Sequence, residues 1–360
     1  MGKYSTFNFV KGQWESLSFE PQDLSEKVII VTGSNVGTCF NPSKSSLPSA
    51  HSVSRHPPPP TKKKKFLTGI GYDTAKALAR MNPTKLILAC RNVGKAKKAV
   101  DEIKTVTGFQ DIEPWDLDLA SFASVRAFAK RFDESGLQLH VLLNNAAVAS
   151  PPDFRTDDGF ETTLQVNHLS TMLLTLLLLP AIRRTTASLT WAPRIILLTS
   201  EVHYWADLPE RTAPNILTTL NNSTAWDTAN RYRVTKLFNV LFVQELARRL
   251  ARSPLLGDRS IVVSSVNPGL TNTNIGVGSL SFIVKKLLFG RSAERSAITS
   301  VYVATAPEVA KLTPYGRYYS NCMAEEAADL TLGVEGEELA GRLWRESLEV
   351  IEVTDAEVKL

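Results

Sequence analysis

Short apolar runs alternate along the chain with longer stretches in which apolar residues recur every three or four positions. Lys85 to Cys90 and Arg194 to Thr199 have the length and composition of buried strands. Val93 to Thr107 and Tyr232 to Ala251 have the spacing of amphipathic helices. This alternation predicts parallel strands joined by helical crossovers. The expected fold is therefore α/β, a single Rossmann-type doubly wound parallel sheet with helices on both faces.

The other expected elements continue the same alternation. Further strands are expected at Lys27 to Val31, at a segment that ends near Asp118, at Val141 to Leu143 and at Ser260 to Val266. Further helices are expected at Gly71 to Met81, at Ala123 to Phe132 and at Asn167 to Arg183. These elements predict one domain over residues 27–345, preceded by an irregular arm at 1–26 and followed by a tail at 346–360.

Residues 38–69 break this pattern. They are rich in Ser, Pro and Lys, and Pro57 to Pro60 is followed almost directly by Lys62 to Lys65. Such a low-complexity segment cannot bury a core, so we expect it to be disordered. Its six Lys and Arg side chains, with no acidic residue among them, account for the formal net charge of +5. Because the rest of the chain is nearly neutral, the basic balance does not indicate a nucleic-acid partner.

A glycine-containing turn follows the first expected strand. Thr32 to Gly37 reads TGSNVG, and omitting 38–69 would continue it directly to Ile70-Gly71 at the start of a helix. A turn of this kind lets the main chain approach a pyrophosphate, and the following helix N-terminus favours the negative charge. A plain strand-to-loop turn is the alternative interpretation of the motif taken alone.

Two origins are considered for residues 38–69. One hypothesis is a translated, unremoved intron, because Gly37-Thr38 and Thr68-Gly69 can be encoded with GT and AG at the two boundaries. The other is a genuine insertion that loops out as a surface flap. Either way, the segment interrupts the anion site between its turn and its helix.

The ends of the second and third strands carry candidate contacts for the adenosine half of a dinucleotide. Arg91 follows the second strand, where an acidic residue would accept hydrogen bonds from a ribose 2′-OH. An arginine there suits a 2′-phosphate and so favours NADP over NAD, with a plain surface arginine as the alternative. Asp118 is a candidate for contact with the adenine edge. The alternative is that Asp118 is the N-cap of the next helix, a role for which Ser121 is also available.

Two further turns are candidates for cofactor contact. Asn144 to Ala147 follows an apolar run, and its small residues would let the main chain reach a cofactor. Asn267 to Thr273 follows the strand that ends at Val266, and a turn there would place Thr273 near a nicotinamide carboxamide. A generic Pro-Gly turn is the alternative for the second motif. The expected contacts are Asn145, Pro268, Gly269 and Thr273.

Tyr232 and Lys236 carry the candidate chemistry. Their i, i+4 spacing puts both on one face of a helix. A lysine ammonium beside a phenol stabilises the phenolate, which makes Tyr232 a plausible general acid or base toward a carbonyl or alcohol oxygen. Ser200 ends an apolar strand and would hydrogen-bond the same oxygen, while Asn167 would hold a water that links Lys236 to solvent. Tyr72 and Lys76 share the spacing, but they follow Gly71 beside the pyrophosphate turn, so we reject them as catalytic.

In this order the six motifs resemble the short-chain dehydrogenase/reductase family. The details Ala89 to Asn92, Asp118 to Ser121, Gly316 to Tyr319 and Leu343-Trp344 resemble its retinol-dehydrogenase-like branch. The arm at Phe9 to Trp14 is similar to fungal members of that branch, many of them associated with secondary metabolism. Ala147 stands where the family usually has a glycine.

The resemblance implies an NADP(H)-dependent oxidoreductase that moves hydride between nicotinamide and a carbonyl or alcohol of a small lipophilic substrate. It implies that Tyr232 exchanges the proton, that Lys236 lowers its pKa and binds the nicotinamide ribose, that Ser200 orients the substrate oxygen and that Asn167 completes the tetrad. The implied pyrophosphate loop consists of Gly33, Asn35, Gly37, Ile70 and Gly71. The alternative is a catalytically impaired binding or regulatory protein of the same fold, because the loop is interrupted.

Location and partners are expected to be ordinary for such an enzyme. Three scattered cysteines, Cys39, Cys90 and Cys322, indicate a reducing compartment. His140, His168 and His203 show no metal-ligand spacing and are interpreted as structural or surface residues. The longest apolar run, Met172 to Ile182, is too short to span a bilayer. A cytoplasmic protein is expected, with membrane association through Ile283 to Phe289 and a homodimer as open alternatives.

Overall fold

The computed structural model of the chain describes residues 12–13, 15–34, 69–150, 154–186, 191–223, 227–272, 290–312 and 316–360. The predictions for Asn35, Gly37 and Thr273 lie outside the described residues, as do those for 38–68 and for the apolar stretch at Ile283 to Phe289.

A single sheet with the strand order β3-β2-β1-β4-β5-β6-β7-β8 forms the centre of the molecule. All neighbouring strands are parallel except β7 and β8. The strands are β1 (Val28–Thr32), β2 (Lys85–Cys90), β3 (Ile112–Asp116), β4 (Val141–Asn144), β5 (Arg194–Leu198), β6 (Val262–Asn267), β7 (Arg317–Ser320) and β8 (Met323–Glu325). The order reverses direction between β1 and β4, as in doubly wound dinucleotide folds.

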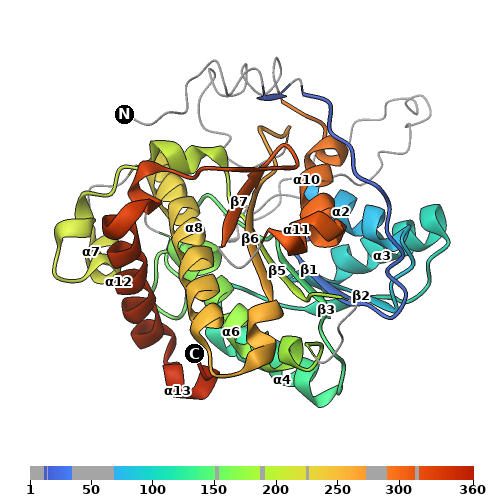
Figure 1. Cartoon of the computed structure of the whole chain (residues 1–360), viewed down its shortest axis with the longest axis horizontal. Helices are drawn as coiled ribbons and strands as arrows, with labels where there is room; N and C mark the ends of the chain where they lie inside the picture. The colour runs from blue at the N-terminus through green and yellow to red at the C-terminus, as the bar shows by residue number, and fades with distance from the viewer. Residues whose placement is uncertain are drawn as a thin grey trace, which may run out of the picture.

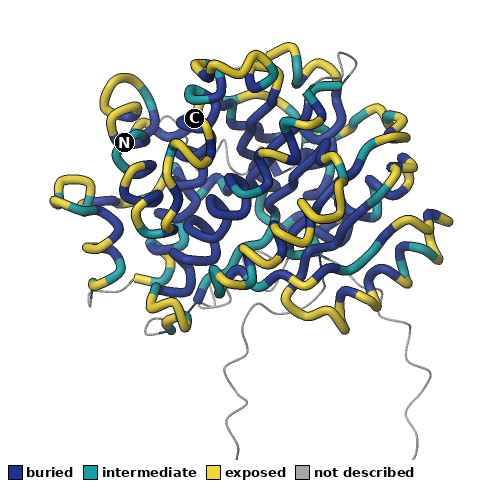
Figure 2. The backbone as a smooth tube through the Cα atoms, turned by 90° about the horizontal axis from the view of Figure 1, so that it is seen from below, coloured by how far each residue is buried: buried dark blue, intermediate teal, exposed yellow. Residues whose placement is uncertain are grey.

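Helices cover both faces of this sheet (Figure 1). One face carries α2 (Ile70–Ala79), α3 (Val93–Thr107), α10 (Ala293–Thr305) and α11 (Pro307–Lys311). The other face carries α4 (Phe122–Glu134), α6 (Ser170–Arg183), α8 (Thr228–Arg252), α7 (Ile216–Asn222) and α12 (Gly333–Ile351). The inner strands are buried (Figure 2). In β1, Ile29 packs against the first group of helices and Ile30 against the second. The predicted fold class is confirmed.

The helix predicted at Asn167 to Arg183 begins earlier and is irregular. It consists of α5 (Thr162–Leu164), a π-helical turn at Gln165–Leu169 and α6. Thr162–Arg183 is long and apolar enough to cross a membrane by length and composition, but 89% of its 18-residue apolar window is buried in the structure. Its apolar side chains therefore serve as core, packed against α4 and the sheet.

The predicted boundary between domain and tail at residue 345 is wrong. α12 continues to Ile351, and a short helix, α13 (Asp355–Val358), follows it. Leu348 and Ile351 are buried in the core, and Arg183 donates from Nη1 to the carbonyl oxygen of Val358 at 2.7 Å. The last residues thus belong to the domain because one face of α12 is apolar along its length.

Arg194, at the start of β5, is a buried cation that closes the end of α10. It is 2% exposed, and it donates to the carbonyl oxygens of Val303 at 2.7 Å and Ala306 at 2.9 Å. A cation is favourable at a helix C-terminus, where these carbonyls lack helical partners. Burial lowers the pKa of its guanidinium to about 10.

We expect Arg194→Met to lower the free energy of unfolding by about 2 kcal/mol, because it removes charged hydrogen bonds and leaves the carbonyls buried. Urea denaturation of the variant measures the change. Arg259→Met, at an exposed arginine, is the matched control and should stay within about 0.5 kcal/mol of the wild type. A similar small loss in both variants would contradict the role given to Arg194.

Candidate active site

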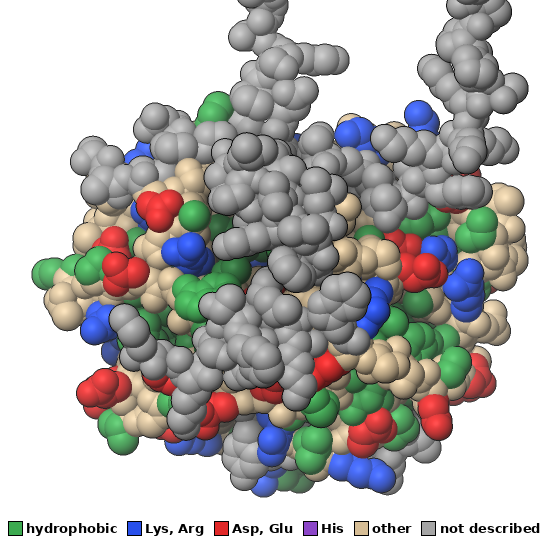
Figure 3. All heavy atoms as spheres, turned by 90° about the horizontal axis from the view of Figure 1, so that it is seen from above, with side chains coloured by type: hydrophobic (Ala, Val, Ile, Leu, Met, Phe, Trp, Pro, Cys, Tyr) green, Lys and Arg blue, Asp and Glu red, His purple; other side chains and the backbone are tan. Residues whose placement is uncertain are grey.

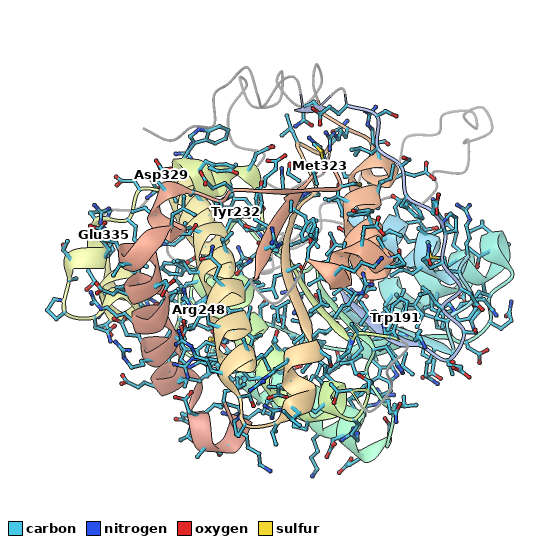
Figure 4. All side chains as sticks on the ribbon, in the orientation of Figure 1. Trp191, Tyr232, Arg248, Met323, Asp329 and Glu335 are labelled. Carbon is cyan, nitrogen blue, oxygen red and sulfur yellow. The ribbon has the colours of Figure 1, made fainter. Side chains whose placement is uncertain are left out.

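The candidate site lies at the carboxyl ends of the central strands. Gly33 follows β1, Asn145 follows β4 and Ser200 follows β5. In doubly wound sheets, ligands bind where the strand order reverses, which here is between β1 and β4. Tyr232, near the start of α8, lies at the upper side of the molecule in the view of Figure 4. Acidic, basic and apolar side chains are interspersed among the described residues of that face (Figure 3).

The two halves of the glycine loop meet although residues 35–68 separate them in the sequence. Asn145 donates from Nδ2 to the carbonyl oxygens of Thr32 at 2.8 Å and Gly33 at 3.2 Å. A Cβ on Gly71, in the first turn of α2, would lie 2.9 Å from that Gly33 oxygen and would collide with the Asn145 amide. Gly33 itself has a φ of +66°, and a Cβ there would lie 2.7 Å from Cα of Ala146. Glycine is therefore required at both positions, and the start of α2 is placed beside the turn.

The surroundings of Asn145 and Ile70 are well defined, whereas the cofactor contacts expected of them stay predictions. The Asn145 side chain supports the turn from behind, since its amide donates to two β1-end carbonyls. Ile70 is the first residue of α2 and is half-buried against the core below it. The sequence prediction did not single out Thr32, whose Oγ1 accepts from the backbone N–H groups of Asn145 and Ala146 at 3.0 Å each. Thr32 is the first residue of the TGSNVG motif, and its place in that motif is the sequence signal that could have indicated its role.

Arg91 and Asp118 lie at the ends of neighbouring strands. Arg91 is exposed directly after β2, and the next residue, Asn92, caps α3 by accepting from the N–H of Lys95 at 2.8 Å. Asp118 accepts from the N–H of Ala120 at 2.9 Å, while Ser121 is the N-cap of α4. The competing N-cap role is therefore filled by Ser121, and Asp118 shapes the turn before it.

Tyr232 and Lys236 lie together on α8, as their spacing predicted. Nζ of Lys236 is 5.5 Å from the centroid of the Tyr232 ring, and it donates to the carbonyl oxygen of Leu198 at 2.7 Å. Lys236 is 2% exposed, and burial lowers the pKa of its ammonium group to about 7. Tyr232 is half-buried. The pair therefore presents a phenol at the surface of the site, with a buried ammonium under it.

Ser200 begins a 3-10 turn, η2 (Glu201–Trp205), that packs on α8. Its carbonyl oxygen lies 2.7 Å from Nδ1 of His203, and Nε2 of that ring accepts from the N–H of Ala328 at 3.2 Å. The histidine is buried and burial lowers its pKa to about 4, so it is neutral with Nδ1 as donor. His203 is thus a structural residue that fixes the main chain at Ser200, in line with its structural or surface interpretation.

Asn167 joins two segments of the candidate site through its side chain. It lies in the π-helical turn, accepts from the N–H of Val148 at 2.8 Å and donates to the carbonyl oxygen of the same residue at 2.8 Å. Its remaining amide hydrogen goes to Oγ1 of Thr235 at 3.1 Å. The side chain therefore ties the segment after β4 to α8 at Thr235, which lies between Tyr232 and Lys236 in the sequence. The water contact expected for Asn167 stays a prediction.

Pro268 and Gly269 lie where they were predicted, immediately after β6. Gly269 has a φ of +75°, and a Cβ there would lie 2.8 Å from Nη1 of Arg291. Neither Arg291 nor Glu201, a 3% exposed acid next to Ser200, was singled out from the sequence. No three His, Cys, Asp or Glu side chains come together as a metal site within the described ranges.

Comparison with known proteins identifies the family. Retinol dehydrogenase 14 of Homo sapiens is 31% identical to this chain over 297 residues, which cover 77% of the chain and 81% of the relative. The chain belongs to the short-chain dehydrogenase/reductase family. Short chain dehydrogenase/reductase dmxR8 of Cryptosporiopsis sp. is 29% identical over 92% of this chain and 93% of that protein. The predicted resemblance to this family and its retinol-dehydrogenase-like branch is confirmed, and it makes the protein an oxidoreductase by family.

The family model for short chain dehydrogenase matches residues 67–201 of this short-chain dehydrogenase/reductase. The match therefore begins just before α2 and leaves out β1 and Gly33, on the other side of residues 35–68. The fold includes both parts. The RhlG/NADP active-site complex of Pseudomonas aeruginosa has a TM-score of 0.56 to this structure at 19% identity, covering 84% of this chain and 98% of that one.

Proposed function

We propose that the protein is an NADP(H)-dependent oxidoreductase that moves hydride between nicotinamide and a carbonyl or alcohol carbon of a small lipophilic substrate. The observation that carries this proposal is the pairing of Tyr232 with a buried Lys236 beside the Ser200 turn. The residues present fit a dinucleotide, because Gly33 and Gly71 keep side chains away from the turn between β1 and α2. When bound, the cofactor supplies or accepts the hydride.

Tyr232 is the residue that exchanges a proton with the substrate oxygen. In the direction of reduction, the phenol donates its proton to the substrate oxygen as negative charge develops there. In the direction of oxidation, the phenolate accepts the proton of the alcohol. The ammonium of Lys236 stabilises the phenolate form, and the Ser200 hydroxyl donates to or accepts from the same substrate oxygen. Asn167 acts through its hold on Val148 and Thr235, as a positioning residue.

The proposed preference for NADP rests on Arg91. Its side chain is exposed at the end of β2, and no acid stands at that point in the sequence to accept hydrogen bonds from a free ribose. A guanidinium pairs with a 2′-phosphate through charge-assisted hydrogen bonds. The RhlG complex with NADP is a protein of this fold with that cofactor, which supports the assignment.

Initial rates with NADPH and NADH on a panel of lipophilic aldehydes, including retinal, test the proposal. We expect NADPH to be preferred, and Arg91→Ala to lower kcat/KM for NADPH about 10- to 100-fold while changing that for NADH about 3-fold or less. Lys98→Ala, on the exposed side of α3, is the matched control and should change neither. Equal use of the two cofactors by the wild type would refute the preference.

The lipophilic class of the substrate is supported by a relative. The name of the human relative refers to retinol, a lipophilic alcohol, and this favours a lipophilic substrate for the present chain. A role in secondary metabolism, a cytoplasmic location and a homodimer stay predictions. The alternative function, a binding or regulatory protein, is favoured by the interruption at 35–68 and disfavoured by the assembled Gly33 and Gly71.

A further inference from the structure

One buried amide joins the turn after β5, which carries Ser200, to the turn after β6. Asn267, the last residue of β6, is 2% exposed, and its Oδ1 accepts from two backbone N–H groups. One is that of Glu201, next to Ser200, at 3.2 Å, and the other is that of Gly269, at 3.0 Å. The turn after β5 and the turn after β6 are thus hydrogen-bonded to the same atom.

The orientation of this amide is determined by its neighbours. Because two N–H donors face one end of it, that end must be the oxygen. The other end, Nδ2, donates to the carboxylate of Glu201 at 3.1 Å and lies 3.3 Å from Oγ of Ser320. Glu201 therefore contacts Asn267 twice, through its main chain and through its side chain. Reversing the amide would set its nitrogen against two donors and its oxygen against a carboxylate.

We propose that Asn267 is a positioning residue that holds Ser200 and the Pro268-Gly269 turn in register, with Glu201 as the partner that keeps its amide oriented. The proposal rests on the proposed function, in which Ser200 meets the substrate oxygen, and on the contact with a cofactor that the sequence predicts for Pro268 and Gly269. Hydride transfer depends on the distance between the substrate and the nicotinamide, and small misplacements slow it strongly.

The charged surroundings of Glu201 come from several elements. Arg291, behind Gly269, attracts its negative charge, whereas Glu325 on β8 repels it. The negative charge of Glu201 also helps to raise the pKa of Tyr204, in the same 3-10 turn. Burial raises the pKa of Glu201 to about 7, and that of Glu325 also to about 7. Glu201 thus changes from protonated to ionised near neutral pH, and in either form its carboxyl oxygen accepts from Asn267.

Swapping the amide of Asn267 and the carboxyl of Glu201 tests the pairing of these two side chains. Asn267→Asp should place a second carboxyl against Glu201 and lower kcat about 10-fold or more, with a larger loss at pH 8 than at pH 6 because both acids are then ionised. Glu201→Gln should change kcat about 3-fold or less, since its amide oxygen can still accept from Asn267. The double variant should recover most of the loss, because the amide introduced by E201Q can donate to the carboxylate introduced by N267D.

Two readouts separate positioning from a simple loss of folded protein. The primary deuterium isotope effect with 4-deuterated NADPH should rise in the N267D variant and return in the double variant, whereas partial unfolding leaves it unchanged. Amide hydrogen exchange over 199–206 and 266–272 should speed up together in N267D and slow together in the double variant. Glu245→Gln, at a buried acid paired with Arg248 and Arg249 on α8, is the matched control.

Two results would overturn the proposal. Faster exchange confined to 266–272 would remove the link to Ser200, and no recovery in the double variant would remove the pairing with Glu201. A wild type without turnover on NADPH and any aldehyde would refute the proposed function alone. In that case the exchange data still decide whether Asn267 holds the two turns together.

Discussion

Tyr232→Phe should lower the turnover number with NADPH and an aldehyde substrate by about a thousandfold, while the affinity for NADPH changes about 3-fold or less. The phenol hydroxyl is the only part removed, and general acid catalysis of this kind contributes about 10²- to 10⁴-fold. The ring still covers Lys236, whose Nζ lies 5.5 Å from its centroid. Initial rates at saturating NADPH, together with a fluorescence titration of NADPH, measure the two quantities.

The chain carries its own control for this substitution. Tyr72 and Lys76 have the same spacing, and Nζ of Lys76 lies 5.6 Å from the Tyr72 ring centroid. Burial and the nearby Glu102 raise the pKa of the Tyr72 phenol, the opposite of what a proton donor near neutral pH requires. We expect Tyr72→Phe to keep the turnover number within about 3-fold. If Tyr232→Phe keeps more than about a tenth of the activity, another group supplies the proton.

Deletion of residues 38–69 should raise the free energy of unfolding by about 2 kcal/mol and leave the affinity for NADPH within about 3-fold, because Gly33 and Gly71 are already assembled in the full chain. In the full chain, residues 35–68 join Ser34 to Gly69, whereas after the deletion only residues 35–37 join Ser34 to Ile70. The connection becomes roughly ten times shorter, and each halving saves about 0.6 kcal/mol of closure entropy, which sums to about 2 kcal/mol. Urea denaturation of the two proteins measures the difference in stability, and parallel fluorescence titrations with NADPH compare their affinities.

The outcomes of this titration separate the two functions. Binding by both proteins supports the oxidoreductase and makes 38–69 a tolerated insertion. Binding by the deleted protein alone means that the segment disables the loop, and sequencing of the transcript then decides whether a shorter, spliced form exists. Absence of binding by both would favour the binding or regulatory alternative and remove the basis of the catalytic proposal.

The bounds of strands and helices were predicted most accurately where several local signals agree. The predicted bounds of β2 and α3 match the structure, because a buried parallel strand is a continuous apolar run and α3 lies between its Asn92 cap and Gly108, whose φ is +79°. The start at Thr162 was missed because its N-cap is Glu161, an acid that accepts from two backbone N–H groups in place of the usual Ser, Asp or Asn. The end of α12 was missed because its many acidic residues obscure the apolar positions.

The candidate catalytic residues could be named from the sequence, but the residues that hold them in place could not. Tyr232, Lys236 and Ser200 follow from spacing and order along the chain. The hold of Asn167 on Val148, 19 positions away, and that of Asn267 on Glu201, 66 positions away, leave no periodic signal. Such contacts can be predicted only when the strand order is known, since the pairing of β5 with β6 brings Glu201 and Asn267 together.

The central place of β1 also bears on the synthesis of the protein. Its neighbours β2 and β4 are both encoded after the interruption, and β4 ends at Asn144. At a translation rate of roughly 5–20 residues per second, the strand therefore waits roughly 5–20 s after its own synthesis before it can pair on both sides. Throughout that time the apolar sequence Val28-Ile29-Ile30-Val31 lacks its native cover. Each residue added between Gly33 and Gly71 lengthens the wait, so we expect the nascent chain to depend more on ribosome-associated chaperones than a chain with an unbroken loop would.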